Sequence, residues 1–283
     1  MATLRDIRRR IRSIESTQKI TRAMQMVAAA KFNRAQGDVR TLRPYAEGME
    51  TLLGHFLRSG HVVEHPLLAR EEVKRRALVV VASDRGMCGA YNSNVLRAAL
   101  EELDRPDSGD VAVIPLGKRA SDFFHKQAWA IPYDSLLGDR LLRSKAEDLA
   151  RNVERLYVTD EVDQVDILYT RFISTLKREI VVSSLLGIRL DVEEHAAGVP
   201  YLIEPSVEEL LADLLPRVLT TRITAMLAEV LASEHSARMI AMQSATDNAE
   251  ELIEELTLIR NRMRQSAITK ELADIVGSAE AMK

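Results

Sequence analysis

The stretch from Ser83 to Asn92, SDRGMCGAYN, contains the residue types best suited to binding a small ligand. It follows a short apolar run and opens a helical pattern, which is where doubly wound sheets bind nucleotides. Its spacing fits neither G-x-x-x-x-G-K-[ST] nor G-x-G-x-x-G, the two phosphate-binding fingerprints. We therefore interpret Gly86 and Gly89 as residues of a tight structural turn, and nucleotide binding here is the less favoured alternative.

Other reactive side chains lack the neighbours that catalysis or metal binding requires. Cys88 is the single cysteine, has neither His nor Lys beside it, and allows no internal disulfide or Cys cluster. His55, His61 and His65 lie close in sequence, but no Cys or carboxylate accompanies them at metal-ligand spacing. The sequence predicts no catalytic residue, no cofactor and no metal. It indicates a protein that acts through interactions.

Charge is concentrated at the start of the chain. The first 34 residues contain nine Arg or Lys and two acids, whereas the net charge of the whole chain is -3. This suits an acidic protein partner, anionic lipid or nucleic acid, although no Tyr or Trp is interleaved to stack on single-stranded bases. Asp6 and Glu15 argue against a mitochondrial transit peptide. No apolar run approaches the roughly 20 residues that cross a bilayer, so membrane insertion is not expected.

Two long helices are predicted at the ends of the chain. The first begins at the capping-box pair Thr3 and Asp6, and its apolar residues then recur at coiled-coil spacing: Leu4, Ile7, Ile11 and Ile14. The second begins at the capping box of Ser206 and Glu209 and is expected to end near Gly277. If residue 59 lies opposite residue 207, the helices pair antiparallel, and residues beyond Ser266 project as a lone helix that needs other surroundings.

The central part of the chain has a different pattern of apolar residues. Short apolar runs at 77–83, 111–117 and 165–172 alternate with helical patterns, which predicts a Rossmann-like, doubly wound parallel sheet. A further run, EIVVSSLLGI, follows the third closely and is expected to return antiparallel at the edge. The predicted organisation is an N-terminal coiled-coil helix at 1–59, an α/β domain at 60–205 and a C-terminal coiled-coil helix at 206–283.

The coiled-coil pattern weakens within STQKITRAMQMVAAAKF, residues 16–32, where Thr, Gln and Ala replace large apolar residues. Small residues on both helices allow close approach, so we expect a narrow rod with polar flanks in this region. The acidic stretch DNAEELIEEL is expected to be solvated or to pair across the coil.

Along essentially its whole length the sequence resembles the gamma subunit of F-type ATP synthases. The resemblance rests on TQKITRAMQMVAAAK, RPYAE, SDRGMCGAYN, SEHSARMIAMQSATDNA and RQSAITKEL. It implies a non-catalytic central rotor shaft that couples proton-driven rotation of the membrane c-ring to ATP synthesis or hydrolysis. The coil would stand inside the ring of alpha and beta subunits, and the α/β domain would contact the c-ring and the epsilon subunit. It also implies a peripheral position on the cytoplasmic face of a bacterial plasma membrane, and no nucleic-acid partner.

The resemblance further implies which residues make contacts. Those that match the family's contacts with the beta subunits and their catch loop are Met24, Arg238, Arg264, Gln265 and Thr269. In the segment YLIEP, Glu204 matches a foot contact with the c-ring or epsilon, whereas a contact from Ile203 is not expected because the family often carries Tyr there. Small and polar residues at the collar would keep the shaft free to turn.

Two interpretations from the residues alone remain as alternatives. One is a coiled-coil interaction scaffold that binds through its basic N-terminus. The other is a nucleotide-binding α/β enzyme with helical arms.

Overall fold

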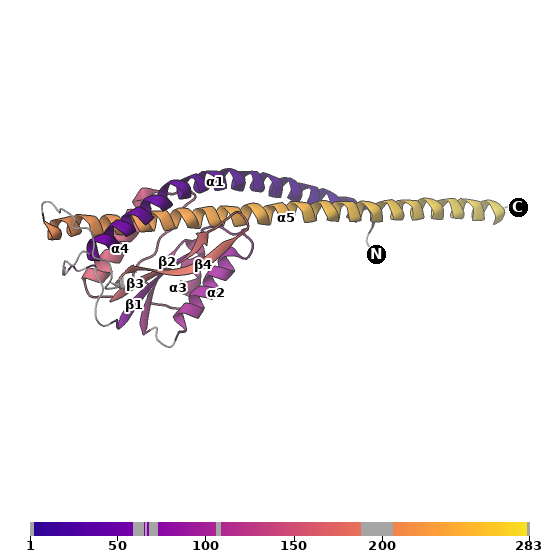
Figure 1. The fold of residues 1–283 in the computed structure, drawn as a ribbon. Helices are drawn as coiled ribbons and strands as arrows, with labels where there is room; N and C mark the ends of the chain where they lie inside the picture. The colour runs from indigo at the N-terminus through magenta and orange to yellow at the C-terminus, as the bar shows by residue number, and fades with distance from the viewer. Residues whose placement is uncertain are drawn as a thin grey trace. The chain divides into compact units, whose positions relative to one another are not determined.

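The structure is a computed structural model that describes residues 3–58, 65, 67, 73–105, 109–187 and 206–281. In chain order its elements are α1 (Leu4–Arg58), β1 (Arg75–Val81), α2 (Tyr91–Leu103), β2 (Asp110–Leu116), α3 (Lys118–Lys126), α4 (Arg143–Val158), β3 (Gln164–Phe172), β4 (Arg178–Leu186) and α5 (Val207–Ala281) (Figure 1). The chain divides into two compact units. The sheet unit is Ala29–Arg238, and the coil unit is Met1–Ala28 together with Met239–Lys283.

The sheet unit contains a four-stranded sheet in the order β2-β1-β3-β4. β1 pairs parallel with both β2 and β3, and β4 pairs antiparallel with β3 at the edge. The predicted doubly wound sheet with an antiparallel edge strand is therefore confirmed. Leu78 and Val80 pack in one cluster with α2 and α3, and Val79 and Val81 on the opposite face are buried as well. Burial on both faces explains why β1 is an unbroken apolar run.

Both long helices begin at the capping residues that the sequence predicts. The Asp6 amide donates to Thr3 Oγ1 at 3.2 Å and the Thr3 amide donates to Asp6 Oδ2 at 3.1 Å, which is a reciprocal capping box. The Glu209 amide donates to Ser206 Oγ at 3.2 Å. The expected end near Gly277 is wrong, because α5 continues to Ala281. The residues after this glycine, SAEA, include good helix formers, and a single glycine costs only about 1 kcal/mol in a helix.

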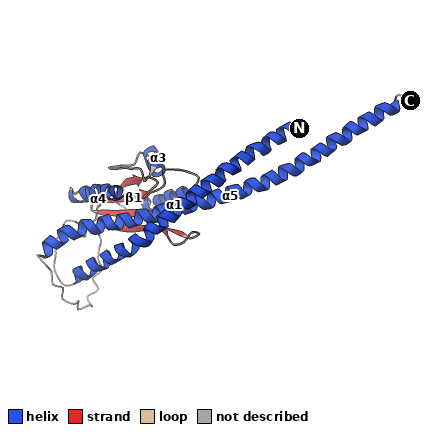
Figure 2. Ribbon diagram, turned by 90° about the horizontal axis from the view of Figure 1, so that it is seen from above, coloured by secondary structure: helices blue, strands red, loops and turns tan. Residues whose placement is uncertain are grey.

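The coil unit pairs the start of α1 with the last part of α5. Hydrogen bonds join Thr21 to Thr246 and Gln25 to Gln243, so residue numbers rise on one helix as they fall on the other. This confirms antiparallel pairing. The predicted register places Ala245 opposite Thr21, whereas the observed partner of Thr21 is Thr246, one residue further on. The prediction assumed that residue 59 lies opposite residue 207, and it took no account of hydrogen bonds between the two helices. α5 continues beyond the start of α1 in both views (Figures 1 and 2).

Among the described residues, no helix is long and apolar enough to cross a membrane.

Candidate functional sites: the glycine turn and the coil surface

The turn Ser83–Asn92 joins β1 to α2 and is closed by its own side chains. Ser83 Oγ donates to the carbonyl oxygen of Arg85 at 2.5 Å and to Asn92 Oδ1 at 2.9 Å, and Asn92 Oδ1 also accepts the Ser83 amide at 3.0 Å. Gly89 has φ 60, a left-handed conformation that glycine adopts at little cost. Met87 shares this conformation at φ 60 and is exposed. The turn is therefore a rigid connection with one strained, outward-facing side chain.

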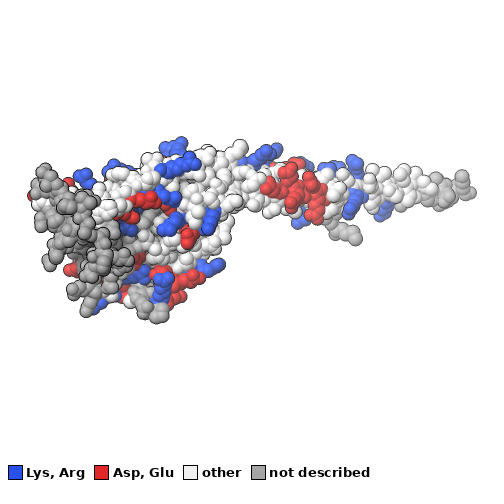
Figure 3. All heavy atoms as spheres, in the orientation of Figure 1, with Lys and Arg blue, Asp and Glu red and all other residues white. Residues whose placement is uncertain are grey.

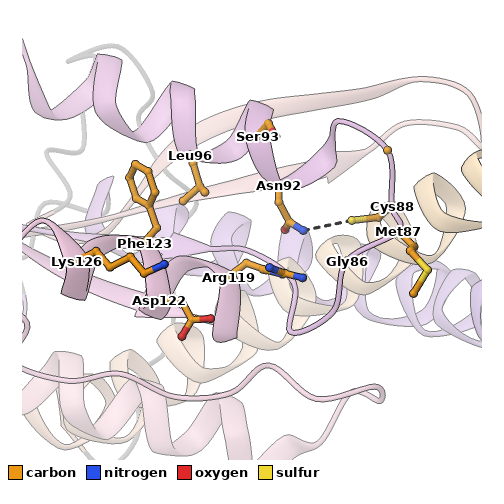
Figure 4. Close-up of a pocket in the computed structure, with 11 residues that line it drawn as sticks. Gly86, Met87, Cys88, Asn92, Ser93, Leu96, Arg119, Asp122, Phe123 and Lys126 are labelled. Carbon is orange, nitrogen blue, oxygen red and sulfur yellow. Dashed lines mark hydrogen bonds between the residues drawn. The ribbon is translucent and has the colours of Figure 1, made fainter.

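A cavity of about 390 Å³ lies beside this turn, between α2 and α3 (Figure 4). Arg119 and Lys126 line it together with Asp122, and the Arg119 guanidinium lies next to Gly86, where a Cβ atom would be 3.0 Å from Nη2. Both cations on α3 are exposed, so water screens their charges and weakens any hold on a ligand. This cavity gives nucleotide binding no specific support.

Cys88 lies at the inner side of the same turn and is buried. Asn92 Nδ2 donates to its Sγ at 3.3 Å (Figure 4). Burial raises the pKa of the Cys88 thiol, so the reactive thiolate is disfavoured at neutral pH. The residue acts as a small core side chain. Among the described residues, no group of His, Cys, Asp and Glu could hold a metal ion.

The crevice in which doubly wound sheets bind ligands is occupied by α5. That crevice lies outside the carboxyl ends of the strands where the strand order reverses, here between β1 and β3. Arg238 donates to the carbonyl oxygens of Arg85 and Gly86, at 3.4 Å and 3.3 Å, beyond the end of β1. Ser233 Oγ donates to the carbonyl oxygen of Thr170 in β3 at 3.2 Å. A helix of the same chain thus takes the place of a ligand.

Arg238 is held by its own chain. It is 9% exposed, forms an ion pair with Glu234 at 2.6 Å and lies 3.3 Å from His235 Nδ1. Burial lowers the pKa of His235 to about 4, so the ring is neutral and its Nε2 can donate to the Asp139 carbonyl oxygen at 3.4 Å. Lys31 of α1 in turn binds Asp139 at 2.9 Å. These contacts join α1, α5 and the glycine turn within the sheet unit.

Sequence reasoning missed a second polar cluster, at the end of β3. Glu229 of α5 accepts the Phe172 amide at 3.2 Å, and Arg43 of α1 donates to Glu229 from Nε at 2.9 Å and to the Phe172 carbonyl oxygen at 2.7 Å. Glu229, Ser233 and Ser236 are all buried on a helix otherwise rich in Ala, Val and Leu. Their spacing of four and three residues places them on one helix face, and this polar stripe was the signal available in the sequence.

The coil unit has polar residues in its seam around residues 18–28, and large apolar side chains on its outer surface there. Thr21 and Thr246 are buried between the helices, whereas Ile20, Met26 and Val27 are 58%, 63% and 56% exposed. Lys19 and Arg22 are exposed as well, so the expected polar flanks are present but are interrupted by large apolar side chains. The seam positions recur every three or four residues and fall on Gln and Thr here, which turns the large apolar residues outward. Met24, predicted to contact another subunit, is half-buried.

The last turns of α5 are exposed on all sides. Arg264, Gln265 and Thr269 are exposed, and so are large apolar residues among and beyond them: Ile268, Leu272, Ile275 and Val276. About 30 Å of helix separates Arg264 from Gln243, which is hydrogen-bonded to Gln25, the next residue in the chain after Met24. Met24 and Arg264 therefore do not belong to one compact site. Glu204 lies outside the described residues.

Charge on the coil unit is arranged in bands along its length (Figure 3). Glu250, Glu251, Glu254 and Glu255 of α5 are exposed, and the structure gives them no ion pair among the described residues. Of the two expectations for this acidic stretch, solvation or pairing across the coil, the structure supports solvation. The exposed basic side chains on α1 of the same unit are Arg5, Arg8, Arg9, Arg10, Arg12, Lys19 and Arg22.

Comparisons with known proteins agree on one family. A family model described as ATP synthase matches residues 3–282. The ATP synthase gamma chain of Pelotomaculum thermopropionicum is 42% identical over 285 residues, and that of Heliobacterium modesticaldum is 43% identical over 291 residues, with 100% of each chain covered in both cases. A chain in the cryo-EM structure of the Euglena gracilis mitochondrial ATP synthase, OSCP/F1/c-ring, superposes with a TM-score of 0.70 at 22% identity, covering 99% of this chain and 94% of that one.

Proposed function

This chain belongs to the family of ATP synthase gamma chains, and on that premise we propose that it is the central rotor shaft of an F-type ATP synthase. The observation that carries the proposal is the construction of the coil unit. Its seam contains polar side chains, while Ile20, Met26 and Val27 face outward and α5 runs on as a single helix with exposed apolar residues. Such a surface is typical of a rod that other chains surround.

The partners follow from the family. Alpha and beta subunits surround the coil unit, and the epsilon subunit and the c-ring contact the sheet unit. The functional segments are the helix at 1–59, the α/β domain at 60–205 and the helix at 206–283. The proposed location is the cytoplasmic face of a bacterial plasma membrane, with this chain bound peripherally, and the likeness to the two gamma chains named above supports it.

The mechanism is conformational. Proton flow turns the c-ring, the sheet unit turns with it, and the asymmetric coil presents a different face to each beta subunit in turn. A rotor shifts a beta subunit between states of different nucleotide affinity only by contacting those states differently. The chain itself catalyses nothing in this proposal. Two features support this statement: α5 fills the usual ligand crevice, and the Cys88 thiol is buried.

The contact residues divide into direct and indirect ones. The residues proposed to contact the beta subunits and their catch loop directly are Met24, Arg264, Gln265 and Thr269. The exposure of the last three supports this role. Arg238 is buried in its own chain, so its contribution to those contacts passes through the glycine turn that it holds. Glu204 contacts the c-ring or epsilon at the foot.

The test is rotation in a reconstituted complex. The purified chain is mixed with alpha and beta subunits of a close relative, the ring is fixed to a surface, and a bead is attached to the sheet unit. ATP is expected to drive stepwise, one-directional rotation, and ATP hydrolysis is expected only when beta is present. Hydrolysis by the purified chain alone, or a chain that does not enter the ring, contradicts the proposal.

A further inference from the structure

We propose that a buried polar clamp makes the sheet of the rotor and its long helix turn as one body. The inference rests on the proposed function and names the positioning residues through which torque passes between the sheet and α5. The sheet clamp consists of side chains on α1 and α5 that bind the main chain at the end of β3 and in the following hairpin: Arg43, Glu229, Ser233 and Ser236.

The clamp grips the β3–β4 hairpin at three successive points. Glu229 accepts the Phe172 amide at 3.2 Å, Ser233 Oγ donates to the Thr170 carbonyl oxygen at 3.2 Å, and Ser236 Oγ donates to the Thr175 carbonyl oxygen at 2.5 Å. The three side chains follow each other along one face of α5. The hairpin main chain is therefore fixed against the helix both along its axis and around it.

Arg43 closes the clamp from the second helix. Its Nη2 donates to the Phe172 carbonyl oxygen at 2.7 Å and lies 2.8 Å from Glu229 Oε1. Phe172 is thus bound at its amide by α5 and at its carbonyl by α1. A force on the sheet reaches both helices of the sheet unit through this one residue.

Polar bonds are needed for this task because apolar packing has no preferred direction. Leu227, Val230 and Leu231 are buried on the same stretch of α5, but the hydrophobic effect is proportional to buried area and has no direction of its own. Hydrogen bonds weaken steeply when their angle changes, and those to charged groups are about twice as strong as neutral ones. Glu229 is 7% exposed, so water does not replace its bonds easily.

The position of the clamp spreads the load over the sheet. β3 lies in the middle of the sheet, hydrogen-bonded to β1 on one side and to β4 on the other. Phe172 is its last residue and pairs with Arg178 of β4. A force applied at Phe172 is therefore distributed over the hydrogen bonds of β3 to β1 and to β4, and does not act on a loop alone.

The test compares two matched buried carboxylates in the assembled complex. Glu229→Gln removes the charge that Arg43 binds. Glu102→Gln removes a carboxylate that is likewise buried, at 4% exposed, and that lies 2.8 Å from Arg76 of β1 and 3.0 Å from Arg105, so that it joins α2 to β1. Each complex is reconstituted into phospholipid vesicles, and ATP hydrolysis and ATP-driven proton pumping are measured in the same sample.

Glu229→Gln is expected to lower the amount of proton pumping per ATP hydrolysed, most clearly against an existing proton gradient, whereas Glu102→Gln keeps the wild-type ratio. A merely structural defect reduces the number of working complexes and so lowers both rates together. Equal ratios in wild type and Glu229→Gln overturn the inference. Failure of the wild-type chain to assemble or pump instead counts against the proposed function.

A milder variant decides the matter if Glu229→Gln does not assemble. Ser236→Ala removes the hydroxyl bond to Thr175 and the bond that Ser236 Oγ accepts from Arg178 Nη1 at 3.3 Å, and leaves the pair of Arg43 and Glu229 intact. It is expected to lower the same ratio under load, and an unchanged ratio in an assembled Ser236→Ala complex contradicts the clamp.

Discussion

Thr21 of α1 and Thr246 of α5 share a buried hydrogen bond of 2.8 Å inside the seam of the coil unit. Gln25 and Gln243 form the next pair along the same seam. Apolar residues usually fill such positions, and a polar residue there lowers stability while it fixes register. Hydrogen bonds therefore set the register in this part of the coil, beside the buried apolar side chains of Met242 and Ala249.

The threonine pair should show measurable coupling. In a double-mutant cycle with Thr21→Val and Thr246→Val, we expect an interaction of about 0.5 to 1.5 kcal/mol, since removing both hydroxyls leaves no donor without its partner. The measurement is urea unfolding followed by circular dichroism. Thr17→Val, on the exposed face of α1, is the control and should change the free energy of unfolding by less than about 0.5 kcal/mol. Strictly additive single effects contradict the coupling.

The outward apolar residues of the coil unit should matter for assembly and not for folding. Ile20→Asn with Val27→Asn is expected to leave the unfolding free energy of the isolated chain within about 0.5 kcal/mol for each change, because both side chains are exposed. Binding to the ring of alpha and beta subunits should weaken clearly. Ile11→Asn is the matched control on the buried seam and should destabilise the chain itself. Unimpaired binding of the double variant to the ring argues against a surrounding sleeve.

Removal of residues 267–283 should separate coupling from folding. The side chains of this segment that the structure describes are exposed or half-buried, so the melting temperature of the truncated chain should remain close to that of the full chain. Rotation or proton pumping by the complex should decline strongly, since the tip loses its bearing contacts. The melting curve and the pumping assay are measured on the same preparation. Full coupling in the truncated complex refutes a bearing role for the tip.

His235 should make stability depend on pH between about 4 and 6.5. Burial lowers the pKa of the folded-state ring from 6.5 to about 4, so in this window the unfolded chain binds a proton that the folded chain does not. Stability from this group is therefore complete above pH 6.5 and is lost as the pH falls towards 4, by an amount on the order of 3 kcal/mol.

The comparison is urea unfolding of wild type and His235→Asn at pH 7 and pH 4.5. Glu234, Arg238, Lys31 and Asp139 surround the ring in both proteins, so their own titration largely cancels in the difference. The wild type should lose more stability on acidification than the variant. Identical pH dependence in the two proteins contradicts a neutral, buried His235.

The sequence was sufficient for the elements and their order because those follow from short-range patterns. β1 contains the apolar run ALVVV and β3 is mostly apolar, β4 follows β3 after a short connection, and Thr3 with Asp6 marks a helix start within four residues. Each feature is set by neighbours in the chain, where period and capping chemistry act directly.

The polar contacts could not be predicted because they join distant parts of the chain. Glu229 and Phe172 are 57 residues apart, and Arg43 and Glu229 are 186 apart. Nothing in the local pattern distinguishes Arg238, which is buried, from Arg264, which is exposed. The predicted register of the coil differed from the observed one by one residue for the same reason, since the partner of Thr21 is set by a hydrogen bond across the coil.

The uncovered end of α5 also bears on how a cell must handle this polypeptide. Whenever the chain is not assembled with other subunits, four large apolar side chains on this helix are exposed to water: Ile268, Leu272, Ile275 and Val276. An unassembled copy is therefore prone to proteolysis and aggregation. Its lifetime should depend on how much of the enclosing subunits is available.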